Sequence, residues 1–181
     1  ADAGAAAGVA YGEIARVLQA RRLTMVHERL FGSLAVKPAV LAARNAALGA
    51  GNLPADSPVT YIQGHPPWGE GWAGVIIRAV SCRHPQDKVW TIWDQGRAVG
   101  RGWRQGDATF FLLQNLQGLV VNGNGANARH LQARRMIQRA ARLLAAHGPS
   151  YRDVVRTWFY LADILSWYPE FNQARSTAYR E

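Results

Sequence analysis

The chain contains 181 residues, which suits one large domain or two small ones, and its 49% content of hydrophobic residues excludes intrinsic disorder. Its 21 basic residues, nineteen of them Arg, outnumber 12 acidic residues and give a net charge of +9. This charge attracts anions in general, but it does not distinguish nucleic acid from an acidic protein or from a small carboxylate or phosphate.

The first half of the chain alternates helical and strand patterns. The apolar spacing predicts a helix over residues 12–22 and a strand over residues 23–31. A second helix is predicted over residues 34–49, where Val40, Leu41, Arg44 and Leu48 recur at helical spacing before a terminal glycine. Two further strands follow, over residues 59–63 and 74–81.

The second half begins with a segment that has no clear period. Residues 82–106 mix Pro, Gly, Gln and Trp, so they are interpreted as a connecting excursion. One or two strands are predicted over residues 107–121, and a helix with an apolar stripe over residues 128–147. Residues 154–161 are apolar on both faces and predict a central strand, and Pro169 marks the first turn of a last helix.

This order predicts an α+β fold in which helices pack on one face of a mixed sheet, arranged as two related halves. The predicted parts are a mobile or helical extension (1–22), an N-terminal half (23–82), the excursion (83–106) and a second half (107–181). Because the last predicted helix has no strand after it, we expect the second half to lack its C-terminal part.

The cellular compartment is predicted from the lack of a membrane span, a signal peptide and a pair of cysteines. No apolar run approaches the ~20 residues that span a bilayer, so no membrane contact is expected. Residues 1–10 have neither a basic region nor a Leu-rich core, which is typical of a mobile end rather than a signal peptide. The single cysteine, Cys82, cannot form an internal disulfide and favours a reducing cytoplasm.

Common cofactor and catalytic motifs are absent or out of context. Residues 69–74 match G-x-G-x-x-G, but a dinucleotide site needs a helix after the motif, whereas residues 75–80 predict a strand. The five His residues are scattered, and Cys82 and His84 form the one close pair of metal-ligand types. Nucleophile and phosphate-loop motifs are missing, so no metal and no cofactor are expected.

A basic stripe lies on the predicted helix over residues 128–147. Arg135, Arg139 and Arg142 share the face opposite the apolar stripe. Such a stripe is usually a solvated helix face. It could also follow a phosphate backbone, with the seven tryptophans as stacking surfaces, so nucleic-acid binding stays open.

Arg156 lies in the predicted central strand, where the period of two places it on one face with Trp158 and Tyr160. A guanidinium on an apolar strand needs an anionic or carbonyl partner, because an unpaired buried charge is costly. That partner could be a ligand carboxylate, or it could be Asp153, Asp163 or a helix C-terminus.

Arg175 lies at the margin of the apolar stripe of the last helix, from which its side chain could turn towards a cleft or remain on the surface. Asp163, just after the predicted strand, could orient either arginine or accept a hydrogen bond from a substrate hydroxyl. Arg156, Tyr160, Asp163 and Arg175 are therefore the candidate substrate-binding residues. No carboxylate stands out as a catalytic acid, so the catalytic residues are unknown.

Residues 136–180 carry a set of motifs that resembles a known family. A helix ending in Leu-Leu-x-x-x-Gly is followed at residues 151–164 by Tyr-Arg-Asp-Val-Val-Arg-Thr-Trp-Phe-Tyr-Leu-Ala-Asp-Ile. Residues 167–175 then read Trp-Tyr-x-x-Phe-Asn-x-Ala-Arg. These motifs resemble the Rid (YjgF-like) superfamily, and the Arg-Thr-Trp-x-Tyr and Ala-Arg elements resemble its chorismatase-like branch. The first hundred residues match that branch loosely.

The resemblance implies a chorismate-mutase-like fold, trimeric or pseudo-trimeric, with clefts between neighbouring sheets. It also implies a small carboxylate ligand such as chorismate, hydrolysis of its enol ether to release pyruvate, and no metal or organic cofactor. Asp163 and Arg175 match substrate-contacting positions of that branch. The decisive groups of both branches lie beyond the point where this sequence ends.

The function expected is therefore a chorismatase-like protein that binds, and could hydrolyse, a small anionic carboxylate. One alternative is a Rid-type hydrolase of imines or enamines, in which an arginine would hold the substrate carboxylate. The other is a basic RNA-binding or regulatory module without catalysis, whose binding should weaken steeply with salt.

Overall fold

The structure is a computed structural model that describes residues 2–64, 66, 71–84, 86–118 and 126–180. It divides into two compact units, Ala1–Asn115 and Leu116–Glu181. The described residues form an α+β fold with four α-helices and two three-stranded sheets, which agrees with the predicted fold class. The structure places the boundary between the units after Asn115, whereas the sequence predicted it between residues 106 and 107. The two differ because the last strand of the second sheet belongs to the first unit.

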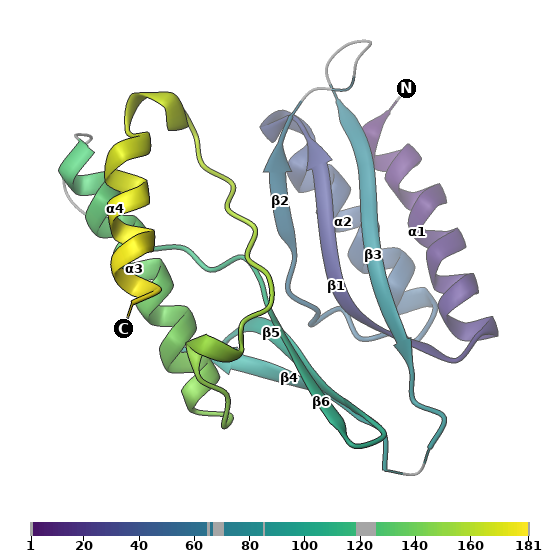
Figure 1. Cartoon of the computed structure of the whole chain (residues 1–181). Helices are drawn as coiled ribbons and strands as arrows, with labels where there is room; N and C mark the ends of the chain where they lie inside the picture. The colour runs from purple at the N-terminus through teal and green to yellow at the C-terminus, as the bar shows by residue number, and fades with distance from the viewer. Residues whose placement is uncertain (1, 65, 67–70, 85, 119–125, 181) are drawn as a thin grey trace. The chain divides into compact units, whose positions relative to one another are not determined.

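Sheet A of the first unit has the strand order β2-β1-β3 (Figure 1). Its central strand is β1 (Leu23–Gly32), which pairs in parallel with β2 (Thr60–Gln63) and antiparallel with β3 (Trp72–Ser81). The three strands were predicted, and they form the expected mixed sheet. A bulge at Val26 separates the pairs that Met25 and His27 form with β3.

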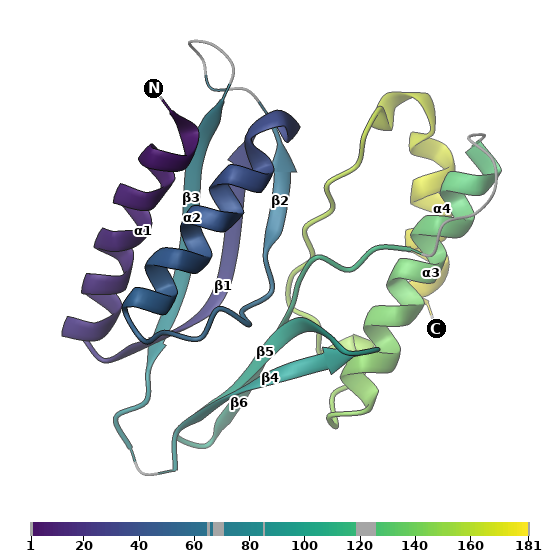
Figure 2. The ribbon, with the colours of Figure 1, turned by 180° about the vertical axis from the view of Figure 1, so that it is seen from behind.

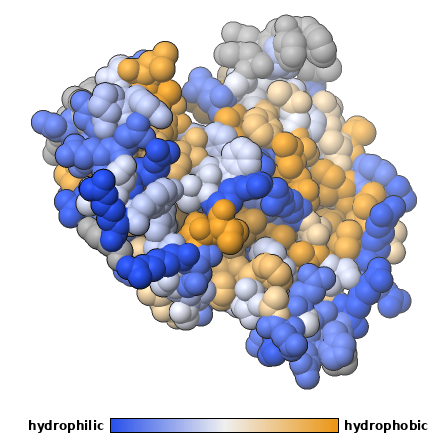
Figure 3. Space-filling model, viewed as in Figure 1, coloured by the Kyte–Doolittle hydropathy of each residue, from blue (hydrophilic) through white to orange (hydrophobic). Residues whose placement is uncertain are grey.

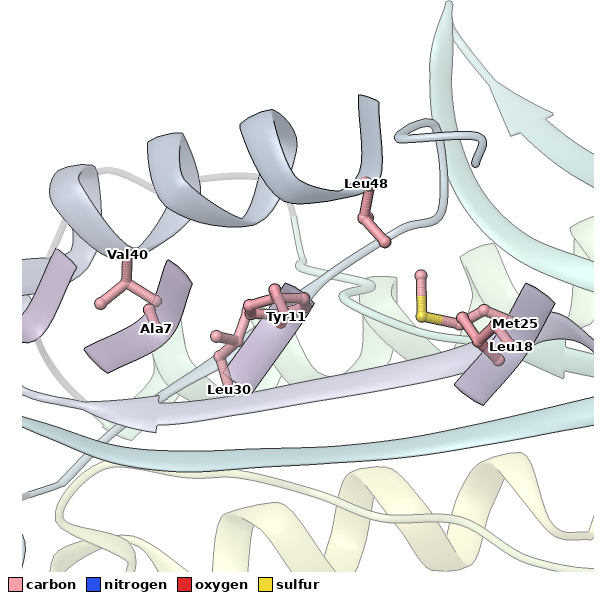
Figure 4. Packing of buried hydrophobic residues seen from close by; sticks show 7 residues of the cluster. All are labelled: Ala7, Tyr11, Leu18, Met25, Leu30, Val40 and Leu48. Carbon is pink, nitrogen blue, oxygen red and sulfur yellow. The ribbon is translucent and has the colours of Figure 1, made fainter. Parts of the chain in front are cut away.

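Two helices cover one face of sheet A, as the view from behind shows (Figure 2). They are α1 (Ala3–Ala20) and α2 (Lys37–Ala50). The helix α1 begins earlier than predicted because Asp2 caps it, so most of the expected mobile end is helical. Their apolar stripes meet the sheet in one core, shown in Figure 4, which contains Ala7, Tyr11, Leu18, Met25, Leu30, Val40 and Leu48.

Sheet B contradicts the predicted excursion over residues 83–106. It is an antiparallel meander of β4 (Lys88–Asp94), β5 (Arg97–Gln105) and β6 (Ala108–Leu113). The hairpin between β4 and β5 turns at Gln95 and Gly96, both of which have positive φ, as a two-residue type I′ turn requires. The period of two was hidden in the sequence because a bulge interrupts the register after Ile92.

The second unit is built from two helices that were both predicted, α3 (Ala126–Ala145) and α4 (Tyr168–Ala178). They pack through a small core of Ala133, Trp167, Phe171 and Ala174. Short 3₁₀ turns at Tyr151–Asp153 and Ile164–Ser166 flank the segment that connects them.

The predicted central strand over residues 154–161 is wrong. The segment is extended, but no described strand pairs with it, and a strand needs a partner for its backbone groups. Its side chains still alternate. Phe159 and Leu161 pack on the core of the second unit, whereas Trp158 and Tyr160 are exposed.

Some sequence predictions fall partly outside the described residues. These include the G-x-G-x-x-G segment, whose residues 69 and 70 are not described. The part that is described, residues 71–74, leads into β3 and not into a helix, as predicted. The end of the strand region predicted over residues 107–121 also lies outside the described residues.

Candidate functional site

Helix α4 places Arg175 beside the core of the second unit. Pro169 lies in the first turn of the helix, and Phe171 and Ala174 are its buried residues. Arg175 follows Phe171 by one turn and is half-buried, with its guanidinium carbon 5.8 Å from the centroid of the Phe171 ring. Within the described ranges, no acidic side chain or carbonyl oxygen contacts this guanidinium, so its charge is balanced by no ion pair there.

Asn172 lies three residues before Arg175 and therefore on the same side of α4. Its Oδ1 atom is buried and has no hydrogen-bond partner in the described structure. Buried polar atoms nearly always have a partner, so an unpaired one calls for an explanation. A guanidinium and an amide on one side of a helix can together bind a ligand that carries a carboxylate and a hydroxyl or amine group.

Asp163 has partners of its own. Its Oδ2 accepts hydrogen bonds from Ser166 Oγ at 2.8 Å and from Arg129 Nη1 at 3.3 Å. The Ser166 hydroxyl, followed by the Arg129 guanidinium, holds the pKa of this carboxyl below its usual range. The carboxylate thus orients Arg129, which sequence reasoning missed because Arg129 lies in no motif. No hydrogen bond or ion pair joins Arg175 to Asp163 in the described structure.

Arg156 and Tyr160 lie on the outward side of the extended segment. Both are exposed, and the guanidinium carbon of Arg156 lies 5.9 Å from the centroid of the Trp158 ring. The expectation that Arg156 needs a buried anionic partner does not hold, because water solvates the exposed charge. No hydrogen bond or ion pair joins Arg156 to Arg175 or to Asp163.

The first unit contains a buried charged cluster that was not predicted. Glu28, which is fully buried on β1, accepts hydrogen bonds from Tyr11 and from Arg44 Nε and Nη2, the latter at 2.6 Å. Burial, and then the charge of Glu28, raise the pKa of Tyr11 above its usual range. One signal was present in the sequence, since Arg44 recurs with Val40 and Leu48 on the apolar stripe of α2.

A second arginine extends this cluster. Arg101 of β5 is buried, forms an ion pair with Asp56 at 2.8 Å and donates to the Thr91 hydroxyl. Arg44 donates to the carbonyl oxygen of Ser57 at 3.2 Å, so two arginines hold neighbouring residues of one loop. Because the carboxylates are already paired with arginines, the cluster leaves little capacity for a ligand, and loss of one partner would leave the other charge buried and unpaired.

The described residues were also compared with the requirements of a metal site, a membrane span and a basic nucleic-acid interface. Within the described ranges, no group of three His, Cys, Asp or Glu side chains could hold a metal ion. No helix there is long and apolar enough to cross a membrane. The basic stripe of α3 is not a uniform solvent face, since Arg135 and Arg139 are half-buried and Arg139 donates to the Gln117 carbonyl oxygen at 3.2 Å.

Comparisons with known protein families, with curated proteins and with solved structures found no match for this chain.

Proposed function

We propose that this protein binds a small carboxylate through Arg175 and Asn172 of α4. The observation that carries the proposal is a half-buried guanidinium without an acidic partner in the described structure. A partly desolvated cation gains most from an anion that forms charge-assisted hydrogen bonds with it. The unpaired Oδ1 of Asn172 adds an acceptor on the same side of the helix.

Chorismate is the test ligand that the resemblance to the chorismatase-like branch implies. It carries carboxylates for Arg175 and a hydroxyl group that can donate to Asn172. Asp163 enters this proposal as a residue that positions Arg129. Arg156 and Tyr160 can reach the ligand only if it extends to the outward side of the connecting segment. A trimeric or pseudo-trimeric assembly, also implied by the resemblance, is proposed with it and can be tested by native mass spectrometry.

Turnover requires more than binding. Hydrolysis of an enol ether needs a group that protonates the terminal carbon, followed by attack of water and release of pyruvate. No described carboxylate contacts Arg175, so the proposal covers binding, and pyruvate release measures whether the protein also catalyses. The imine-hydrolase alternative uses an arginine in the same way and differs in its product, which is ammonia.

The test is calorimetric titration of the whole chain with chorismate. Replacing Arg175 with Gln should weaken binding by about tenfold or more, because a charge-assisted hydrogen bond is lost. The Arg175→Lys variant should lose less, since it keeps the charge. Arg180→Gln is the matched control, because it removes the same charge from an exposed position five residues along the chain.

Two results would count against the proposal. Equal affinities of the parent chain, Arg175→Gln and Arg180→Gln would show that Arg175 does not contact the ligand. Absence of binding by the parent chain at millimolar chorismate would exclude this ligand. Circular dichroism of each variant confirms that a lost affinity does not reflect a lost fold.

A further inference from the structure

Sheet A has a second face that neither α1 nor α2 covers, and Figure 1 looks onto it. Cross-strand partners point to the same face of a sheet, so the register of β1 and β3 fixes what this face carries. Glu28, Leu30 and their partners face the helices. The intervening pairs face away from the helices, and in order along β1 they are His27–Arg78, Arg29–Ile76 and Phe31–Gly74.

The uncovered face is therefore basic at one end and apolar at the other. Three basic side chains gather there, and among the described residues of the three strands no acidic side chain shares the face, since Glu28 points to the helices. Arg78 is exposed and forms no ion pair in the described structure. The space-filling view from this side shows hydrophilic and hydrophobic surface next to each other over sheet A (Figure 3).

The protonation state of His27 depends on the neighbouring side chains of this face. Burial, and then the charges of Arg29 and Arg78, lower the pKa of His27 to about 4, so the imidazole is neutral at pH 7. Its Nδ1 atom is buried and has no hydrogen-bond partner in the described structure. A bound anion would lie close to a ring that can then accept a proton.

The apolar end is hollowed. An open depression of about 350 Å³ lies there, lined by Phe31, Gly64, Ala73, Gly74, Val75 and Ile76. Gly74 contributes no side chain, and nothing lies within 4 Å of where its Cβ would be. This volume is at the lower end of the range for small-molecule pockets, so it suits a single ring. Ile76, which lines it, is the direct cross-strand partner of Arg29.

We propose that the uncovered face of sheet A binds a small organic anion with an apolar ring. The ring lies in the hollow against Phe31 and Ile76, and the anionic group lies at Arg78 beside His27. A carboxylate and a phosphate share this chemistry. A single-stranded nucleic acid fits less well, because successive bases need several aromatic platforms and Phe31 is the one aromatic side chain that this register places on the face.

The test uses the whole chain, with benzoate and phenyl phosphate as probes and the His27 ring resonances in NMR as readout. Benzoate should shift these resonances and raise the pKa of His27, because a neighbouring anion favours the imidazolium form. Arg78→Gln should weaken benzoate binding by about tenfold. Arg21→Gln, which removes the same charge from an exposed position just after α1, should leave it unchanged.

The anionic contact and the contact of the apolar ring are tested separately. Benzamide, a neutral molecule of the same shape, should bind much more weakly than benzoate, and inorganic phosphate, which has no ring, should also bind more weakly than phenyl phosphate. Equal binding within either pair would overturn the proposal. So would His27 resonances that do not move at millimolar benzoate, or a short oligouridylate that displaces benzoate at lower concentration than phenyl phosphate does.

This site shares no residue with α4, so the two proposals fail independently. Arg175→Gln should leave the response of His27 to benzoate unchanged, and Arg78→Gln should leave the affinity measured at the Arg175 site unchanged. A loss of the His27 response in Arg175→Gln would contradict a separate site on sheet A.

Discussion

Among single residues, Arg44 contributes to the first unit through a charge that is almost fully removed from water. Its side chain is 3% exposed, and Glu28, its partner, is 0% exposed. Removing one member of a buried ion pair leaves the other charge unpaired, which costs about 3–5 kcal/mol. We therefore expect Arg44→Met to lower the free energy of unfolding by about this amount, measured by urea denaturation.

The exposed ion pair of α1 supplies the control. Arg16 and Glu13 are joined at 2.5 Å, but their side chains are 67% and 59% exposed. Arg16→Gln should cost about 0–1 kcal/mol. Replacing both Glu28 and Arg44 with apolar residues should recover part of the loss, because no unpaired charge then remains. Equal losses for Arg44→Met and Arg16→Gln would contradict this account.

The candidate site could be predicted from the sequence only in part. The apolar stripe of the last helix was enough to place Arg175 beside a buried surface, because helical spacing fixes which side chains share a face. The partner of Asp163 could not be predicted, since Arg129 lies more than thirty residues away and is brought there by tertiary packing. The face shared by His27 and Arg78 likewise depends on a register that includes a bulge.

At the scale of secondary-structure elements, residues 154–161 show why a correct pattern can give a wrong element. The period of two was predicted, with Trp158 and Tyr160 on one face, but both faces were expected to be buried. One face is exposed, and on the other Phe159 packs against Phe171, with ring centroids 5.0 Å apart. Whether such a segment is a strand depends on a hydrogen-bonding partner, which no local pattern encodes. In sheet B the error was the reverse, because real strands were not predicted. The strands β4 and β5 pair with each other and are adjacent in sequence, but a bulge disturbs the alternation of their side chains.

Replacing a glycine with alanine should change the free energy of unfolding in opposite directions in β5 and in α1. In β5, a Cβ on Gly102 would come within 2.3 Å of the Trp90 ring, so that ring must move. We expect Gly102→Ala to lower the free energy of unfolding by about 1–3 kcal/mol. In α1, nothing lies within 4 Å of a Cβ on Gly12, so Gly12→Ala should raise it by about 0.5–1 kcal/mol.

The thermal midpoints of the two variants check this contrast. Gly102→Ala should melt at a lower temperature than the parent chain, and Gly12→Ala at a higher one. If Gly102→Ala has no effect, then Trp90 does not occupy the space over Gly102 in solution. The near-ultraviolet circular dichroism, to which all seven Trp side chains contribute, tests independently whether the packing of aromatic rings changes.

For the whole molecule, the predicted division was displaced because sheet B was not recognised. Once residues 83–106 are interpreted as an excursion, the next strand is assigned to the second half. The structure instead places β6 beside β5, with Arg104 opposite Thr109, and so within the first unit. The composition predicted an ordered chain, and the order of helical and strand patterns predicted the α+β class, because neither prediction depends on which strands pair.

The net charge of +9 belongs to the whole chain and should determine how the affinities for both proposed ligands depend on salt concentration. The Debye length falls from about 30 Å at 0.01 M salt to about 8 Å at 0.15 M, so distant charges stop contributing. The affinities for chorismate and benzoate should therefore fall steadily as sodium chloride is added. Benzamide, which is neutral, should show no such trend. Arg180→Gln should keep the trend, because one exposed charge is a small part of the total. If benzoate and benzamide respond to salt alike, then electrostatic attraction does not drive anion binding, and a hydrophobic contact accounts for it.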